Sequence, residues 1–171
     1  LRLWGPDGQS GKVLRGHEFS VVGAPVLADT SILSWDSGGN LRLWGPNDHQ
    51  GRVLRGHEGW VFRALALTDN VGFLSWGANG TLQLWEADGQ QAGVLRGHEG
   101  SVYGALALGD GTGFLSWGAD GRLILWNRRG EMKNVWLSPA GAITHVESYG
   151  EGDQYLVASG RHICIVHLAQ S

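Results

Sequence analysis

A repeat of about forty residues runs through most of this chain of 171 residues and restricts the folds that it can adopt. The motif Leu-x-Leu-Trp occurs at Leu1–Trp4, Leu41–Trp44, Leu82–Trp85 and Leu123–Trp126, at steps of 40, 41 and 41. Gly-His-Glu recurs in step with it, at 16–18, 56–58 and 97–99. Residues 53–85 and 94–126 align without a gap and are identical at 24 of 33 positions. A fixed period of this size indicates an array of one supersecondary unit.

Each unit reads as a set of short strands. In the unit 94–126, apolar runs of a few residues at 94–96, 101–108, 114–117 and 122–126 are separated by glycine-containing turns such as Gly109-Asp110-Gly111. Runs of this length with turn signals every eight to twelve residues are typical of antiparallel strands in an all-β protein. A four-stranded sheet has two faces to bury, and radial stacking of such sheets gives a β-propeller. The alternative is a β-trefoil, but that fold has three units, whereas the Trp motif occurs four times here and a degenerate copy follows.

Composition and charge exclude several classes of function. Hydrophobic residues make up 42% of the chain and charged residues 17%, which is the composition of a globular protein. The net charge is −3, so the chain lacks the basic surface that drives binding to nucleic acids. No apolar run approaches the roughly 20 residues that a membrane-spanning helix needs. Cys164 is the single cysteine, which excludes an intrachain disulfide and is typical of a cytoplasmic protein.

The order of residues in each unit resembles the WD-repeat β-propellers. In one unit the match lies in Gly97-His98, Val102, Ala105, Asp120-Gly121 and Leu123–Trp126. The resemblance implies one propeller domain over 1–171, in which 1–15 are the last two strands of an incomplete blade and further blades lie near 20–55, 60–96, 101–137 and 142–168. Residues 12–15 are then candidates for the outer strand that the last blade lacks. Because Leu1 stands inside a motif, and the near-identical copies resemble large bacterial WD-repeat arrays, we expect a fragment of a larger propeller.

The repeated histidines are expected to be structural. A metal site would need ligands that converge on one ion, whereas equivalent positions in successive blades lie apart. The resemblance implies instead a hydrogen-bonded set of His, Ser, Asp and Trp in each blade. The set is complete in the third full unit, with His98, Ser116, Asp120 and Trp126. The second has His57, Ser75, Asn79 and Trp85, and the first has His17, Ser34 and Trp44 with Gly38 in the place of the Asp, which predicts a weaker network there. We expect no metal, no cofactor and no catalytic residue.

Function in a repeat protein is better sought where the copies differ. The start of the innermost strand varies most, and the resemblance places it at the rim of the central opening, where partners of such proteins bind. The candidate partner-binding residues are Phe19, Val22, Trp60, Phe62, Arg63 and Tyr103. Aromatic residues and arginine are what binding hot spots favour. We therefore predict a non-catalytic protein-interaction scaffold with a protein partner.

A carbohydrate-binding propeller is the alternative function. The second strand of each unit carries a repeated tryptophan, at Trp35, Trp76 and Trp117, which is explained either by packing between blades or by a platform that stacks on sugars. Exposure of these rings would favour the sugar platform. We further expect the chain to self-associate, through closure of a larger ring, because open blade faces and free strand edges favour association.

Overall fold

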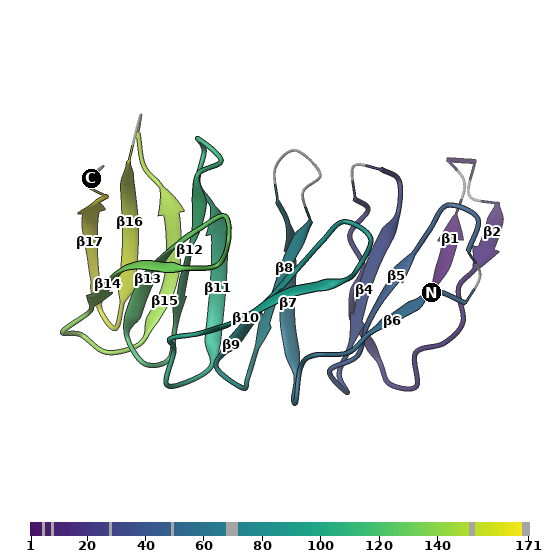
Figure 1. The fold of residues 1–171 in the computed structure, drawn as a ribbon, viewed down its shortest axis with the longest axis horizontal. Coiled ribbons are helices and arrows are strands. Elements are labelled where there is room, and N and C mark those ends of the chain that lie inside the picture. Colours follow the sequence, from purple (N-terminus) through teal and green to yellow (C-terminus); the bar gives the residue numbers. More distant parts are fainter. Residues whose placement is uncertain are drawn as a thin grey trace.

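The computed structural model describes residues 1–4, 6–7, 9–27, 29–48, 50–67, 72–150 and 153–168, which form five antiparallel sheets (Figure 1). A two-stranded pair comes first, with β1 (Arg2–Trp4) and β2 (Ser10–Val13). Blade 1 contains β3 (Val21–Gly23), β4 (Ile32–Asp36), β5 (Leu41–Trp44) and β6 (Arg52–Leu54). Blade 2 contains β7 (Val61–Ala66), β8 (Phe73–Gly77), β9 (Thr81–Trp85) and β10 (Gln91–Arg96). Blade 3 contains β11 (Val102–Ala107), β12 (Gly113–Gly118), β13 (Arg122–Asn127) and β14 (Met132–Leu137), and blade 4 contains β15 (Ile143–Ser148), β16 (Gln154–Ser159) and β17 (His162–His167).

The sequence repeat is reproduced as a repeat of strand register. In each of the first three blades the strands lie in chain order, and the second strand pairs with the third so that Trp44, Trp85 and Trp126 face Ile32, Phe73 and Phe114. The turn between these two strands contains a glycine with positive φ, at +74° for Gly80 and +75° for Gly121. Glycine adopts this left-handed conformation without a steric penalty, so these positions close the turn tightly.

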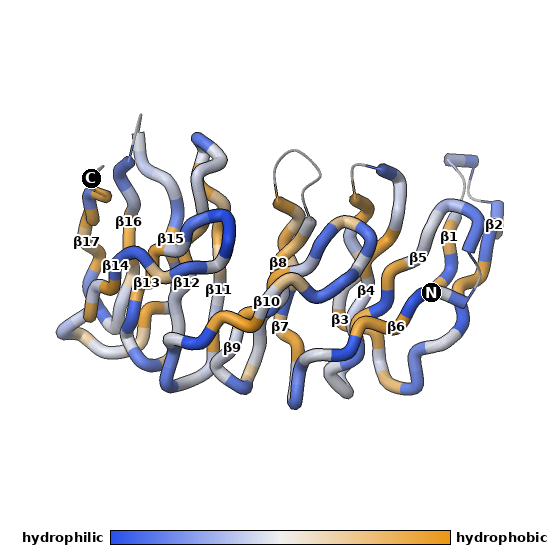
Figure 2. Tube along the Cα trace, viewed as in Figure 1, coloured by the Kyte–Doolittle hydropathy of each residue, from blue (hydrophilic) through white to orange (hydrophobic). Residues whose placement is uncertain are grey.

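The hydrophobic core lies between the sheets. Figure 1 shows the sheets standing side by side in a row, and Figure 2 shows apolar strand segments alternating with polar loops at their ends. Three buried clusters join the blades. Leu33, Trp35 and Leu41 of blade 1 pack on Val61, Phe73 and Trp85 of blade 2, and the equivalent residues join blade 2 to blade 3 and blade 3 to blade 4. We call the face of a blade that packs on the next blade in the sequence its forward face, and the opposite face its rear face. The forward face of blade 1 contains Leu33, Trp35, Leu41 and Leu43, and the rear face of blade 2 contains Val61, Ala64, Phe73 and Trp85.

The two ends of the row lie far apart (Figure 1). The pair β1–β2 stands at one end and the three-stranded blade 4 at the other. Residues 12–15 were expected to be available for completing the last blade, but in this structure β2 pairs with β1, with Val13 facing Arg2. No helix in the described part of the chain has the length and apolar character needed to cross a membrane.

Candidate functional site

A buried polar chain runs through each of the first three blades and begins at the repeated tryptophan of the third strand. The indole Nε1–H donates a hydrogen bond to a serine hydroxyl on the neighbouring second strand. The distances are 2.8 Å for Trp44 to Ser34, 2.9 Å for Trp85 to Ser75 and 2.8 Å for Trp126 to Ser116. All three serines are fully buried. Because a buried polar atom without a partner costs free energy, this pairing explains why Ser and Trp recur together.

The chain continues from serine to histidine. The serine Oγ lies 2.7 Å from Nε2 of His17, 2.7 Å from Nε2 of His57 and 2.8 Å from Nε2 of His98. The serine oxygen accepts from the indole, so its own proton is free to point toward Nε2. That arrangement assigns the ring proton of each histidine to Nδ1, which then needs an acceptor.

Blade 3 supplies the acceptor in full. Nδ1 of His98 lies 3.0 and 3.1 Å from the two carboxylate oxygens of Asp120, which also accept from the Glu99 and Arg122 amides. Burial of the Asp120 carboxyl opposes ionisation, but the hydrogen bonds from the Glu99 amide and His98 outweigh this and hold the pKa of Asp120 below its ordinary value. Burial also lowers the pKa of His98, against the opposing effect of Asp120. At neutral pH the pair is therefore an ionised aspartate that accepts from a neutral imidazole.

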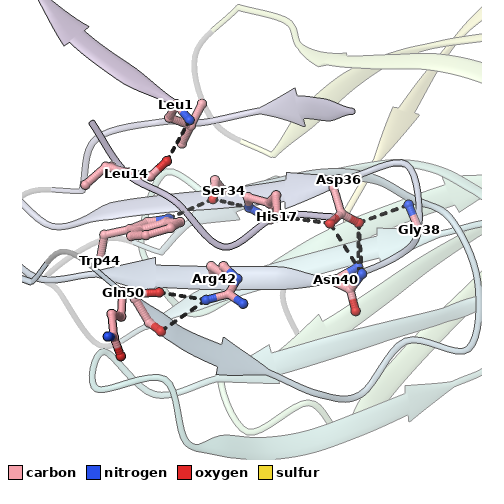
Figure 3. A network of polar contacts seen from close by, with 11 residues as sticks. Leu1, Leu14, His17, Ser34, Asp36, Gly38, Asn40, Arg42, Trp44 and Gln50 are labelled. Carbon is pink, nitrogen blue, oxygen red and sulfur yellow. Dashed lines mark hydrogen bonds and ion pairs between the residues drawn. The ribbon is translucent and has the colours of Figure 1, made fainter. Parts of the chain in front are cut away.

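Blade 1 has the same complete set of buried hydrogen bonds, although the sequence prediction based on Gly38 was a weaker network. The carboxylate comes from Asp36, whose Oδ2 lies 2.7 Å from Nδ1 of His17 (Figure 3). The other oxygen, Oδ1, accepts from the Gly38 and Asn40 amides at 2.9 and 3.1 Å. Burial opposes ionisation of Asp36, but the bonds from His17 and Asn40 keep its pKa below the ordinary value. The prediction of a weak network in this blade was wrong, because an aspartate at the end of β4 reaches the histidine from another position in the turn.

Blade 2 is the blade in which the set of buried hydrogen bonds is incomplete. Asn79 was predicted to take the place of the aspartate, but its Oδ1 accepts from the amide and hydroxyl of Thr81, at 3.3 and 3.1 Å. Nδ1 of His57 is buried without a hydrogen-bond partner among the described residues. Burial lowers the pKa of His57 to about 4, against a smaller opposing effect of Asn79. The weak blade is thus the second and not the first.

The repeated tryptophans of the second strands are buried between blades. The exposed fractions of Trp35, Trp76 and Trp117 are 5%, 2% and 7%, and each ring belongs to the hydrophobic cluster between its own blade and the next. Packing between blades explains their repetition. A sugar cannot stack on rings buried in this way, so the proposed sugar platform does not exist in this arrangement.

The candidate partner-binding residues form an exposed set at the starts of the innermost strands. The exposed fractions of Trp60, Phe62 and Tyr103 are 64%, 36% and 45%, whereas Trp85 and Trp126 are 2% exposed. The prediction that the rim aromatics are more exposed than the repeated tryptophans is confirmed. Phe19, Val22 and Arg63 are exposed as well. These residues follow the connections between successive blades, which lie along the lower edge in Figure 1.

Sequence reasoning missed Asp36 as a member of the buried chain. Blades 2 and 3 have Gly77 and Gly118 directly after the second-strand tryptophan, and blade 1 has Asp36 there. The signal was available, since Asp36 is the only carboxylate within the segment 35–40. Among the described residues, no three His, Cys, Asp or Glu side chains are grouped so as to hold a metal ion.

Comparison with known structures identifies the fold. No protein-family model matches the chain, and no curated protein is similar to it in sequence. The WD40 β-propeller domain of Doa1 superposes with a TM-score of 0.71 at 24% identity, over 93% of this chain and 54% of that one. The C-terminal WD40 domain of Sif2 superposes with a TM-score of 0.81 at 15% identity, over 99% of this chain and 54% of that one. The chain therefore has the all-β fold of WD40 propeller blades and spans about half the length of these domains.

Proposed function

We propose that this chain is a non-catalytic interaction scaffold that binds a protein partner at the rim defined by Phe19, Val22, Trp60, Phe62, Arg63 and Tyr103. The observation that carries this proposal is the exposure of Trp60. Its exposed fraction is 64%, in a chain whose repeated tryptophans from Trp35 to Trp126 are at most 7% exposed. Burying a large exposed aromatic ring against a partner removes much apolar surface from water, and aromatic residues of this kind are common in binding hot spots.

The variation between copies supports the same surface. Blades 2 and 3 agree closely in their buried residues, yet Trp60 in blade 2 corresponds to Ser101 in blade 3, and Arg63 corresponds to Gly104. The repeated packing does not require a tryptophan at position 60, because blade 3 has serine at the equivalent position. WD40 propellers generally act as scaffolds for protein partners, and this property agrees with the rim as a binding surface.

The experiment is a selection of peptides that bind the chain, from a displayed library of random sequences. Clones are tested against the original chain and against Trp60→Ala and Phe62→Ala. Val26→Ala is the matched control, because Val26 is 67% exposed and lies in the connection after β3, away from the rim. We expect the rim variants to weaken binding of the selected peptides by about 1–4 kcal/mol, the range of aromatic hot spots.

Folding of the variants is checked by circular dichroism and by the denaturation midpoint. If selected peptides bind Trp60→Ala, Phe62→Ala and Val26→Ala as well as the original chain, the rim is not the binding surface. If no peptide or protein ligand is selected by a chain that is folded, the scaffold function itself is contradicted.

A further inference from the structure

The forward face of blade 4 has no sheet against it in the described part of the chain. Ile163 and Ile165 occupy the positions of Leu123 and Leu125 in blade 3, because Ile163 faces Ala158 as Leu123 faces Trp117. Ile163 is 74% exposed, whereas Leu123 is 1% exposed and its equivalents Leu41 and Leu82 are fully buried. Blade 4 thus presents to water a surface that every other blade covers with its neighbour.

The same blade has a free strand edge. In blades 1 to 3 an outer strand pairs with the third strand, and a valine faces the central residue of that strand. The pairs are Arg42 with Val53, Gln83 with Val94, and Ile124 with Val135. In β17 the equivalent central residue is Cys164, which faces Val157 as Ile124 faces Ser116. No described strand lies on the outer side of β17.

A hollow lies beside the free edge of β17. Its volume is about 400 Å³, and it is lined by Ser138, Pro139, Ser159, His162, Ile163 and Cys164. Pro139 stands where the other blades have histidine, so the polar chain of the other blades is absent here and the hollow is lined largely by apolar groups. The edge of β17 therefore offers backbone hydrogen bonds beside a largely apolar hollow.

At the other end of the row, the rear face of blade 1 lacks a complete blade against it in the described part of the chain. Val21 and Ile32, on the rear face of blade 1, are half-buried, although their equivalents Val61 and Phe73 in blade 2 are 2% and 0% exposed. The pair β1–β2 stands next to blade 1 in the row, and Leu14, which follows β2, is 3% exposed. A complete preceding blade would cover it with two further strands.

We propose that two copies of this chain join head to tail, with β2 of one copy serving as the outer strand of blade 4 in the other. The segment Val13-Leu14-Arg15 has the same sequence as Val53-Leu54-Arg55 and Val94-Leu95-Arg96, which form outer strands or continue them in blades 1 and 2. In the shared register Val13 faces Cys164 and lies beside the hollow. Leu14 then faces Ile163, as Leu54 faces Leu41.

In the assembly β17 of the second copy displaces β1 from β2. The three residues of β1 are all exposed, and Trp4 is 62% exposed because no second strand with a serine lies beside it. β1 cannot replace β17 in blade 4, since Val157 of β16 stands where the other blades have the serine that accepts from tryptophan. The contact therefore exchanges β1, all of whose residues are exposed, for a strand that already belongs to a three-stranded sheet.

The extent of the chain is consistent with a ring made of two copies. The chain superposes on 54% of each of the two WD40 domains, so two copies supply slightly more chain than one such domain. Two identical head-to-tail junctions then close a ring, which is the outcome of a heterologous contact whose rotation closes. In that ring the forward face of blade 4 and the rear face of blade 1 are covered in each copy, and the free edge of each β17 is paired with β2 of the other copy.

The test traps the junction by a disulfide. Facing residues of an antiparallel pair have Cα atoms about 4.5–5.5 Å apart, within the range that a disulfide spans. Val13→Cys is therefore expected to form a covalent dimer with the native Cys164 of the other copy under mild oxidation, in a closed ring with two such bonds. Val53→Cys is the matched control, because it has the same place in blade 1 but already faces Arg42. Val13→Cys combined with Cys164→Ser is the second control.

The mass in solution is measured by light scattering on the unmodified chain and on Ile163→Asp. Ile163 is exposed in the single chain, so this substitution leaves the fold intact but places a carboxylate in the junction. We expect twice the monomer mass for the original chain and for Val26→Asp, and the monomer mass for Ile163→Asp. A stable monomer, a dimer that persists in Ile163→Asp, or equal cross-linking of Val53→Cys and Val13→Cys overturns the proposal. Cross-linked polymers without a dimer overturn the closed ring.

Discussion

Nδ1 of His17 lies 2.7 Å from Oδ2 of Asp36, and this contact completes the buried polar chain of the first blade, as Asp120 completes that of the third. Asp36 reaches the histidine from the end of β4, whereas Asp120 reaches His98 from the turn before β13. Both carboxylates are buried, and both hold backbone amides of their own turn. Two different positions in the sequence therefore supply the same acceptor to the same polar chain.

The first prediction is that Asp36→Ala and Asp120→Ala destabilise the chain to a similar extent. Each substitution removes the acceptor of a buried imidazole N–H and of backbone amides, which costs about 1–3 kcal/mol. The free energy of unfolding is measured in urea, with Glu58→Ala as the control because Glu58 is an exposed carboxylate. A loss for Asp120→Ala alone would show that the contact between His17 and Asp36 contributes nothing.

The second prediction is a gain of stability in Asn79→Asp. Asn79 occupies the position of Asp120, and Nδ1 of His57 is buried with no hydrogen-bond partner in the described part of the chain. An aspartate there offers a second oxygen to His57 while it keeps the bonds from Thr81, so the free energy of unfolding should rise by about 1–2 kcal/mol at pH 7. The pKa of His57, followed by NMR titration, should rise in the same variant. A stability equal to or below that of the original chain would contradict this assignment.

The third prediction concerns pH. His57 has a folded-state pKa of about 4, against an ordinary value of 6.5, so the unfolded chain binds this proton more readily between those two values. Stability is then complete above pH 6.5 and falls as the pH is lowered toward 4. A shift of this size corresponds to a loss on the order of 3 kcal/mol from this one group.

His57→Gln isolates that contribution, because glutamine cannot take up a proton in this range. Urea denaturation at pH 7, 6, 5 and 4 should give a shallower loss for His57→Gln than for the original chain. His98 contributes in the same direction, since burial lowers its pKa also, and it is present in both proteins. Parallel curves for the two proteins would show that His57 is not protonated on unfolding.

The fourth prediction separates the two classes of tryptophan by stability. Trp126→Phe removes a buried donor that holds Ser116 at 2.8 Å, so it should lower the free energy of unfolding by about 1–3 kcal/mol. Trp60→Ala should change it by less than about 0.5 kcal/mol, because an exposed side chain makes few contacts in the folded state. Thermal and urea denaturation of the two variants decide the point, and a large loss in Trp60→Ala would place that ring in the core.

Sequence reasoning was most effective for features that the period repeats. A strand register that alternates sides fixes which residues face a neighbouring blade, so Leu41, Leu82 and Leu123 were predictable as one set with one environment. The serine and tryptophan partners were implied by the resemblance to WD-repeat propellers and stand at the same aligned position in each blade. The rim aromatics could be named because they vary where the core does not.

The sequence by itself determined the strands and the blades, because each is a local pattern copied about every forty residues, and its resemblance to WD-repeat propellers implied the polar chain. Only the tertiary structure decided that Asp36 comes within hydrogen-bonding distance of His17, that Asn79 turns toward Thr81, and that the rings of Trp35, Trp76 and Trp117 lie between sheets. These outcomes depend on how a turn folds back and on which sheet packs on which face. A hydrogen bond needs its two atoms within about 3 Å, and a change of two residues in a turn moves the acceptor by more than that.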